Sequence, residues 1–467
     1  MTTARTALED LWTLAGCDPA ALAQAELTGD DPVLPSIFRV GTAASASIAA
    51  SALAAAELWR LRCGRRQGVA VDMRAAAAAF RSERYLQIDG EPSRELWDPI
   101  AGYYRTGDDR WVQLHTNLPQ HRDGVLEMLH CANSRAGVAD ALSRLSGREI
   151  EDRLIEARLP GGLLRSPEEW RAHPQGQAVA RLPLLEILRI GDAPPEALPA
   201  GERPLSGIRA LDLTHVIAGP VGTRTLAAHG AEVLRIGARH LPAMGSLLVD
   251  TGRGKRSAWL DLRKPDEAER LRALVRRADI FVQGYRPGAI AARGFSPEAV
   301  AALRPGIVYV TLSAFGHEGP WRDRRGFDSV VQTLSGIAWE GGRAAGIDGP
   351  KPLPAQALDH ATGYLIAFGA MAALARRAQE GGSWLVRLSL AQTGRWLNGL
   401  GRIDGIGAPD PTRDEVADLL ETNDGPFGRV TATAPAATLS ETPAFWASPA
   451  ALPGAHPPIW ADEAGSA

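Results

Sequence analysis

The chain has 467 residues and a formal net charge of −3. This length favours two domains over one small core, and the charge argues against a general nucleic-acid binder. The three scattered cysteines (Cys17, Cys63, Cys131) predict neither a disulfide framework nor a metal site and fit a reducing cytoplasm, and residues 1–30 show no secretory signal.

The first part of the chain is predicted to be mainly helical. Residues 1–32 fit one amphipathic helix and a turn, and residues 41–61 fit an Ala-rich helix. Its uncharged part, 41–56, is short and rich in Ala and Ser, which favours a buried helix over a membrane span. A short strand at 68–73 leads into a second Ala-rich helix through Tyr85. A hairpin with a Gly-Asp turn is predicted at 103–114. Helical patterns follow at 122–129, 136–145, 148–157 and 168–173.

Residues 194–204 are rich in Pro and are predicted to form a linker. Beyond it, strand, helix and strand follow one another at 208–213, 221–229 and 232–236, an order typical of a parallel α/β domain. Ligands of such sheets bind beyond the carboxyl ends of the strands, where His215 falls. Further strands are predicted at 257–262, 279–283, 307–312 and 384–389, with helices at 265–277, 296–303 and 362–378 and another beginning near 328.

One internal similarity links the two parts. Residues 34–40 resemble residues 353–359, at an offset of 319, and each stretch precedes an Ala-rich helix, a Gly-containing turn and a short apolar strand. Ala-rich helices look alike, so this similarity is weak alone.

An ordered set of short motifs runs through residues 205–395. The motifs include Pro204-Leu205-x-Gly207, Leu211-Asp212-Leu213, Ala218-Gly219-Pro220, Gly230-Ala231-Glu232-Val233, Gly254-Lys255-Arg256-Ser257, Arg286-Pro287-Gly288, Gly326-Phe327-Asp328 and Asp359-x-x-Thr362-Gly363. Single pieces are common, but their order is specific, and the stretch resembles the class III CoA-transferases (CaiB/BaiF), the family of formyl-CoA and carnitine CoA-transferases. The resemblance implies a Rossmann-like parallel-sheet CoA-binding domain with a smaller α+β domain.

The first part resembles a different portion of the same family, from its Ala-rich helix through its small domain. The matching pieces include Gly68-x-x-Val71-Asp72-Met73 and Tyr104-x-Thr106-x-Asp108. The chain therefore reads as a circular permutation with overlap, or as a fusion of two truncated copies. The expected division is a helical extension (1–33), a degenerate first copy (34–193), the linker (194–204), the catalytic domain (205–400) and a Pro-containing tail that packs back (401–467).

Asp359 is the catalytic carboxylate that the resemblance implies. It would attack an acyl-CoA thioester to give an acyl-aspartyl anhydride, and the CoA thiolate would then form an aspartyl thioester that the incoming acid takes over. A carboxylate at a helix N-terminus suits this role, because the adjacent N–H groups can receive an oxyanion. Spacing alone favours an ordinary N-cap aspartate, and the ordered family motif reverses this preference in favour of catalysis. The first copy has Val40 at the equivalent position, so at most one active site is expected.

The resemblance also implies a set of CoA contacts near the carboxyl ends of the strands. CoA or acyl-CoA is expected as a substrate, with no permanently bound cofactor, and the absence of a Gly-x-Gly-x-x-Gly after Leu213 argues against NAD. Basic side chains in the set could meet phosphates. The set is His215, Ile217, Ala218, Lys255, Arg256, Leu260, Arg263, Gly284, Tyr285 and Arg286.

Several positions depart from the family pattern and keep alternatives open. Gly237 and Gly284-Tyr285 replace residues that family members carry near the adenine and ribose. Related racemases use a His where this chain has Phe327, which disfavours racemisation, and His360 is a weak stand-in. The pair Arg324-Arg325 is expected to be solvated.

A CoA-transferase is therefore the main prediction, with a degenerate acyl-CoA binder and an acyl-CoA racemase or isomerase as alternatives. The expected partners are an acyl-CoA and a small carboxylic acid, with no nucleic acid and no membrane. Family members form intertwined homodimers, and this chain is expected to do so unless its duplicated segment lets one chain cover what two share.

Overall fold

A seven-stranded sheet forms the centre of the computed structural model, which describes residues 2–93, 97–241 and 245–463. Strands β11, β10, β9, β12, β13 and β14 run parallel in that order, and β8 pairs antiparallel with β14 at one edge. The strands are β8 (Glu186–Gly191), β9 (Arg209–Leu213), β10 (Glu232–Gly237), β11 (Lys255–Trp259), β12 (Ile280–Gln283), β13 (Val308–Ser313) and β14 (Ser383–Ser389).

The predicted α/β order is confirmed, and it produces a switch point between β9 and β12. From β9 the chain builds outward through β10 and β11, and it then returns to the other side of β9 with β12. The loops after β9 and β12 leave in opposite directions, which creates a crevice at the carboxyl ends of these two strands. Strand β8, assigned from sequence to the first copy, instead completes this sheet.

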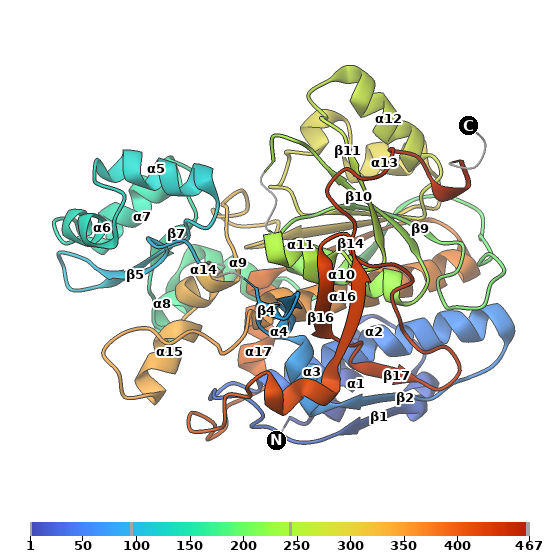
Figure 1. The fold of residues 1–467 in the computed structure, drawn as a ribbon, viewed down its shortest axis with the longest axis horizontal. Coiled ribbons are helices and arrows are strands. Elements are labelled where there is room, and N and C mark those ends of the chain that lie inside the picture. Colours follow the sequence, from blue (N-terminus) through green and yellow to red (C-terminus); the bar gives the residue numbers. More distant parts are fainter. Residues whose placement is uncertain (1, 94–96, 242–244, 464–467) are drawn as a thin grey trace.

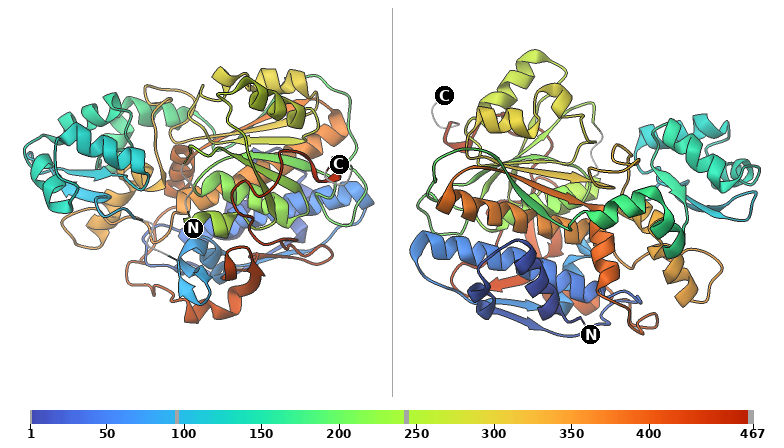
Figure 2. Two further views of the ribbon diagram at one scale, coloured as in Figure 1. Left: turned by 45° about the horizontal axis from the view of Figure 1, so that its top comes forward. Right: turned by 180° about the vertical axis from the view of Figure 1, so that it is seen from behind.

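Helices cover both faces of the sheet (Figure 1). On one face lie α12 (Pro265–Val275) and α13 (Pro297–Leu303), which enclose a core with the buried side chains of the strands. On the other face lie α10 (Ala218–Ala228) and α16 (Ala357–Glu380), and α2 (Val40–Cys63) packs along α16 beneath them (Figure 2). The largest hydrophobic core lies between these layers.

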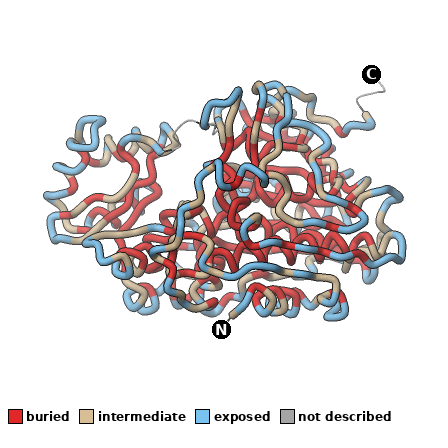
Figure 3. Tube along the Cα trace, turned by 60° about the horizontal axis from the view of Figure 1, so that its bottom comes forward, coloured by how far each residue is buried: buried red, intermediate tan, exposed pale blue. Residues whose placement is uncertain are grey.

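The two 24-residue helices α2 and α16 are the paired Ala-rich segments of the sequence. Both are long and apolar enough to cross a membrane, yet the apolar window of each is wholly buried inside the protein (Figure 3). Each is capped by a carboxylate from elsewhere: Asp31 accepts from the N–H groups of Gly41 (3.0 Å) and Thr42 (2.7 Å), and Asp328 caps α16. These contacts satisfy N–H groups that a helix start leaves free.

Residues 100–163 form a small lobe with its own hydrophobic core (Figure 1). Its strands are β5 (Gly102–Arg105), β6 (Trp111–Leu114) and β7 (Gly161–Leu163), and the predicted hairpin is confirmed. Its helices are α5 (Pro119–Leu129), α6 (Arg135–Leu142) and α7 (Gly147–Glu156).

Three strands tie the two ends of the described chain together, and only the middle one was predicted. The strand predicted at 68–73 is confirmed as β2 (Val69–Asp72). It pairs parallel with β1 (Ala25–Thr28) and antiparallel with β17 (Ala437–Leu439), neither of which the sequence patterns predicted. The helix expected through Tyr85 is broken into α3 (Met73–Ala79) and α4 (Ser82–Tyr85). The other elements are α1 (Ala4–Leu14), β3 (Gln87–Ile88), β4 (Glu91–Pro92), α8 (Pro167–Ala172), α9 (Pro174–Arg181), α11 (Gly245–Thr251), α14 (Asp328–Leu334), α15 (Ile337–Ala344), α17 (Leu390–Gly399), β15 (Leu420–Gly425) and β16 (Gly428–Thr433), with four short 3-10 turns.

The glycine of the Asp-x-x-Thr-Gly motif lets α10 approach α16. A Cβ on Gly363 would lie 2.7 Å from the carbonyl oxygen of Ala218, and one on Gly222 would lie 2.5 Å from Ile366. Because Asp359 lies one turn before Gly363, this close crossing fixes the start of α16 against the loop that follows β9.

We expect Gly363→Ala to destabilise the protein by about 1–3 kcal/mol, since the added methyl overpacks a helix crossing whose nearest atom is backbone. Guanidinium unfolding measures this loss. The matched control is Gly399→Ala, where an added Cβ meets nothing within 4 Å. An unchanged unfolding midpoint for Gly363→Ala would contradict the close packing of α10 on α16.

Candidate active site

A cavity of about 360 Å³ lies where the small lobe, the first part of the chain and the sheet edge meet. Both parts of the chain contribute to its wall, so the described lining is composite within one chain. The first part supplies Glu83, Arg84, Ser93, Trp97, His115, Asn117 and Leu118, and the second part supplies Val216, Ile217, Leu247, Phe327, Asp328, Gln356 and Asp359.

Asp359 occupies the first turn of α16 and lines this cavity. The residue is 7% exposed, and among the described residues no hydrogen bond or ion pair engages its carboxylate. The structure therefore leaves these oxygens free to meet a substrate, which an ordinary N-cap aspartate would not.

Asp328 performs the capping role instead. Its Oδ2 accepts from the N–H of Asp359 at 2.9 Å, and its Oδ1 accepts from the side-chain amide of Gln332. Asp328 is fully buried at the start of α14, so this carboxylate is held by the fold while that of Asp359 faces the cavity.

Both carboxyl groups have raised pKa values. Burial, followed by the nearby carboxylates of Asp328 and Glu83, raises the pKa of Asp359 well above its usual value. Burial raises the pKa of Asp328 to about 6, although the N–H of Asp359 and the Gln332 amide oppose the change. Two carboxyl groups this close in a dry site disfavour double ionisation.

His360 is turned away from the role of a racemase base. Its Nε2 lies 3.0 Å from Oε2 of Glu83, and its ring stacks on Phe80 with centroids 5.6 Å apart. It is fully buried and does not belong to the described cavity lining, whereas Glu83 does. His360 thus positions Glu83.

His115 enters the cavity from the end of β6, over the side chain of Phe327. The two rings are stacked with centroids 4.0 Å apart and an interplanar angle of 4°. Burial, and then the neighbouring His121, lower the pKa of His115 to about 3. The imidazole is therefore neutral at pH 7, which makes it a hydrogen-bonding group and a poor proton acceptor.

The loop after β9 is held in a strained conformation beside the cavity. Val216 has φ 72°, which a β-branched residue rarely adopts. Buried Asp212 fixes the loop from below, since its Oδ1 accepts from the N–H of Thr214 (3.0 Å) and its Oδ2 accepts from Thr223 (2.7 Å).

Lys255 belongs to the buried hydrogen-bond network around Asp212 and does not face an open phosphate site. Its Nζ donates to Asp212 (2.9 Å), Thr223 (2.7 Å) and the carbonyl of Pro220 (2.8 Å), and the residue is 3% exposed. Burial lowers its pKa to about 8, with Asp212 opposing the change. The interpretation of Lys255 as a phosphate ligand is therefore not supported by its position.

Some of the other predicted CoA residues lie around the switch point, and the rest are buried or paired elsewhere. His215 and Tyr285 meet at the switch point, with Nε2 and the phenol oxygen 3.3 Å apart, and Gly284 and Arg286 lie exposed beside them. Ile217 and Ala218 are buried at the start of α10. The remaining members are engaged elsewhere: Arg256 pairs with Glu232 (3.2 Å), Arg263 pairs with Asp261 (2.7 Å), and Leu260 is buried.

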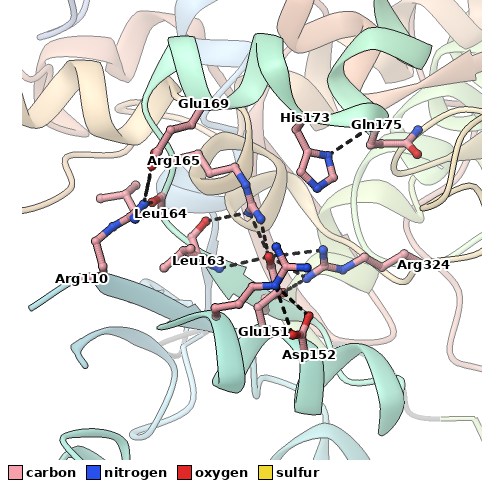
Figure 4. A network of polar contacts seen from close by, with 12 residues as sticks. Arg110, Glu151, Asp152, Leu163, Leu164, Arg165, Glu169, His173, Gln175 and Arg324 are labelled. Carbon is pink, nitrogen blue, oxygen red and sulfur yellow. Dashed lines mark hydrogen bonds and ion pairs between the residues drawn. The ribbon is translucent and has the colours of Figure 1, made fainter. Parts of the chain in front are cut away.

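A buried ionic cluster ties the small lobe to the loop before Asp328 (Figure 4). Glu151 on α7 accepts from Arg165 (2.9 Å) and Arg324 (3.3 Å), and Arg324 also donates to the carbonyl of Gly161 (2.7 Å). The prediction that Arg324 is solvated was wrong, because its side chain is 5% exposed. The cluster fixes the loop that carries Phe327 and Asp328.

Sequence reasoning missed most of the cavity wall. Asp328 had a signal, because it ends the Gly-Phe-Asp motif. Glu83, Arg84 and His115 had none, since each lies in a local pattern that reads as an ordinary helix or strand end. Only the packing of the first part against the second brings these side chains to Asp359.

The family model described as CoA-transferase family III matches residues 205–404. An acyl-CoA transferase of Gibberella moniliformis is 30% identical over 421 residues, which cover 80% of this chain and 73% of that protein. This alignment extends well outside the family match. The acetyl-coenzyme A transferase nodX of Hypoxylon pulicicidum is 31% identical over 71% of this chain.

The chain spans 58% of the Hypoxylon protein and 50% of a probable fatty acyl-CoA transferase of Mycobacterium tuberculosis, which is 31% identical. A solved Mycobacterium tuberculosis structure covers 42% of this chain and 57% of its own, at 30% identity and a TM-score of 0.39. A CaiB/BaiF family structure from Brucella suis is 26% identical with a TM-score of 0.38.

Proposed function

This chain belongs to CoA-transferase family III and is an enzyme of that type, and we propose that Asp359 is the nucleophile with which it moves CoA from an acyl-CoA thioester to a free carboxylic acid. The observation that carries the proposal is the free carboxylate of Asp359 at the start of α16, facing a cavity that the rest of the chain encloses.

The reaction is a series of acyl exchanges at one carboxylate. An oxygen of Asp359 attacks the thioester carbonyl, which releases CoA thiolate and leaves a mixed anhydride. The thiolate attacks the aspartyl carbonyl, which frees the donor acid and leaves an aspartyl thioester. The incoming carboxylate displaces the thiolate again, and the thiolate takes the new acyl group and restores the aspartate.

The environment of Asp359 suits this chemistry. Burial and the neighbouring carboxylates raise its pKa, and a more basic carboxylate is a stronger nucleophile once ionised. Neutral His115 and the amides of Asn117 and Gln356 line the same cavity, where they can donate hydrogen bonds to the oxygens that become negative in the exchange.

CoA is proposed to reach the cavity along the switch point. His215 and Tyr285 contact each other at the switch point. Val216 and Ile217, which follow His215 in the loop after β9, line the cavity. The exposed guanidinium of Arg286 is the member of the predicted set best placed for a phosphate, since Arg256 and Arg263 already have carboxylate partners.

The relatives are named for acyl, acetyl, formyl and dicarboxylic substrates, among them a succinate–glutarate CoA-transferase of Agrobacterium fabrum and a formyl-CoA:oxalate CoA-transferase of Streptomyces coelicolor. A small carboxylic acid is therefore proposed as the acceptor. We further propose a cytoplasmic location, which the three free cysteines suit.

A homodimer stays a prediction, and the structure favours a modified form of it. The described cavity wall comes from two parts of one chain, which supports the proposal that one chain forms the site without segments of a second copy. If copies associate, we expect each to carry its own site and no exchange of cavity-lining segments.

The trapping experiment tests the proposed nucleophile. The protein is incubated with acetyl-, succinyl- and longer acyl-CoAs, treated with hydroxylamine and digested, and the peptide that contains Asp359 is weighed by mass spectrometry. We expect a hydroxamate on Asp359 with at least one donor and none in Asp359→Asn. CoA binding without an adduct from any donor would instead assign the degenerate acyl-CoA binder.

A further inference from the structure

The cavity holds one charged group that the proposed chemistry leaves unused. Its described lining carries three carboxyl groups but a single basic side chain with a fixed charge, that of Arg84. Glu83 is engaged by His360 and Asp328 by the start of α16. For Arg84, in contrast, no hydrogen bond or ion pair of the guanidinium is found among the described residues.

The position of Arg84 exposes this charge to the cavity. It lies on α4, between buried Glu83 and buried Tyr85, and is itself exposed. Its neighbour Arg81 is buried and pairs with Asp410 at 2.6 Å. Although part of the side chain meets solvent, partial desolvation by the surrounding chain, followed by repulsion from Arg81, lowers the pKa of Arg84. A guanidinium still keeps its charge at neutral pH, so this site favours an anion.

A guanidinium presents a planar fork of N–H donors that matches the two oxygens of a carboxylate. When a substrate fills the cavity, it covers part of the exposed Arg84 side chain. An uncharged acyl chain would remove water from the guanidinium without replacing the lost hydrogen bonds, which costs free energy. A second carboxylate on the substrate would satisfy it. Asp359 and Arg84 thus mark two sites in the same cavity, one for the reacting carbon and one for a fixed negative charge.

We propose that Arg84 holds the far carboxylate of the substrate, so that this site serves dicarboxylic acids and their mono-CoA thioesters; this rests on the function proposed for Asp359. The source of Arg84 supports the assignment to the acid and not to CoA. Arg84 comes from the first part of the chain with Ser93, His115 and Asn117, whereas the expected CoA contacts come from the loops after β9 and β12.

The test compares acids of equal length that differ only in the far carboxylate. Succinate and butyrate, then glutarate and pentanoate, serve as acceptors with whichever acyl-CoA labels Asp359, and kcat and KM are measured for wild type, Arg84→Gln and Arg84→Lys. We expect wild type to prefer the dicarboxylic member of each pair, and Arg84→Gln to lose about 10- to 100-fold in kcat/KM for it alone. Arg84→Lys should recover part of that loss.

The matched control is Arg144→Gln, an exposed arginine on the small lobe that pairs with Asp140, and it should leave every constant unchanged. Thermal shift with succinate and with butyrate, in the presence of CoA, gives a second readout that needs no turnover. A wild type that treats both acids alike, or a preference that survives Arg84→Gln, overturns the proposal. A higher KM for acyl-CoA alone in Arg84→Gln also overturns it and assigns Arg84 to CoA phosphate. Failure to label Asp359 counts against the transferase, while the thermal shift still reports on Arg84.

Discussion

Asp359→Asn is expected to lower kcat by about 10⁴-fold or more while leaving CoA binding intact, because the amide is nearly isosteric with the carboxylate and cannot act as the nucleophile. The capping bond to Asp328 comes from the backbone N–H of Asp359, so the substitution of the side chain leaves this bond in place. Single-turnover kinetics with the labelling donor, together with calorimetric titration of CoA, separates the two effects. Residual turnover within 10-fold of wild type would show that another group carries the acyl transfer.

The raised pKa of Asp359 determines the direction in which the stability of the fold changes with pH. Its folded pKa lies above the unfolded value, so the folded state holds the proton more tightly, and the fold loses stability as pH rises from the unfolded toward the folded pKa. Asp359→Asn removes this loss. We therefore expect the variant to be more stable than wild type at pH 8 and closest to it near pH 4, as measured by thermal unfolding.

Adduct formation should show the matching profile, rising with pH as Asp359 ionises. Asp328→Asn supplies the control, because Asp328 is one cause of the raised pKa of Asp359. The Asn side chain can still accept from the Asp359 N–H, and removal of the charge should move the rise in adduct formation to lower pH. A profile that stays in place would show that Asp328 does not act on Asp359 electrostatically.

The α/β part of the fold could be predicted because its signals are local. Buried strands such as β9 and β13 appear as short apolar runs, and the loops after them carry the motif residues. Strands β1, β15, β16 and β17 have no such pattern, since each is at least partly exposed. Strand β1 pairs with β2, which lies 44 residues further along the chain. The tail strands β16 and β17 pair with β3 and β2, which lie more than 300 residues earlier in the chain.

The residues of the proposed active site also differ in whether the sequence alone could predict them. Asp359 was predictable, because the start of an Ala-rich helix and the motif around it are contiguous in sequence. Arg84 and His115 were not, because they reach the cavity only when α2 packs on α16 and the small lobe docks through the Glu151 cluster. The duplicated Ala-rich helix therefore has a structural consequence: it brings the first part of the chain to the catalytic edge of the second.

Lys255 shows where counting residues misled the sequence interpretation. One of only three lysines in the chain suggested a phosphate ligand, but its ammonium is enclosed by Asp212, Thr223 and Pro220. Asp212 in turn orients the loop that leads to Val216. Lys255 therefore has a structural role, in which a single compact charge fits between β9, α10 and β11.

We expect Lys255→Met to destabilise the protein by about 3–5 kcal/mol, because it leaves the carboxylate of Asp212 buried without its counter-charge. Chemical unfolding measures the loss, with Lys264→Met as the control, since Lys264 is exposed and forms a surface ion pair with Glu267. The double variant Asp212→Asn/Lys255→Met should regain much of the stability, as removal of both charges removes the unpaired one. If Lys255→Met instead unfolds like wild type and raises only the KM for acyl-CoA, the lysine reaches CoA after all, and the loop after β9 must open to let it do so.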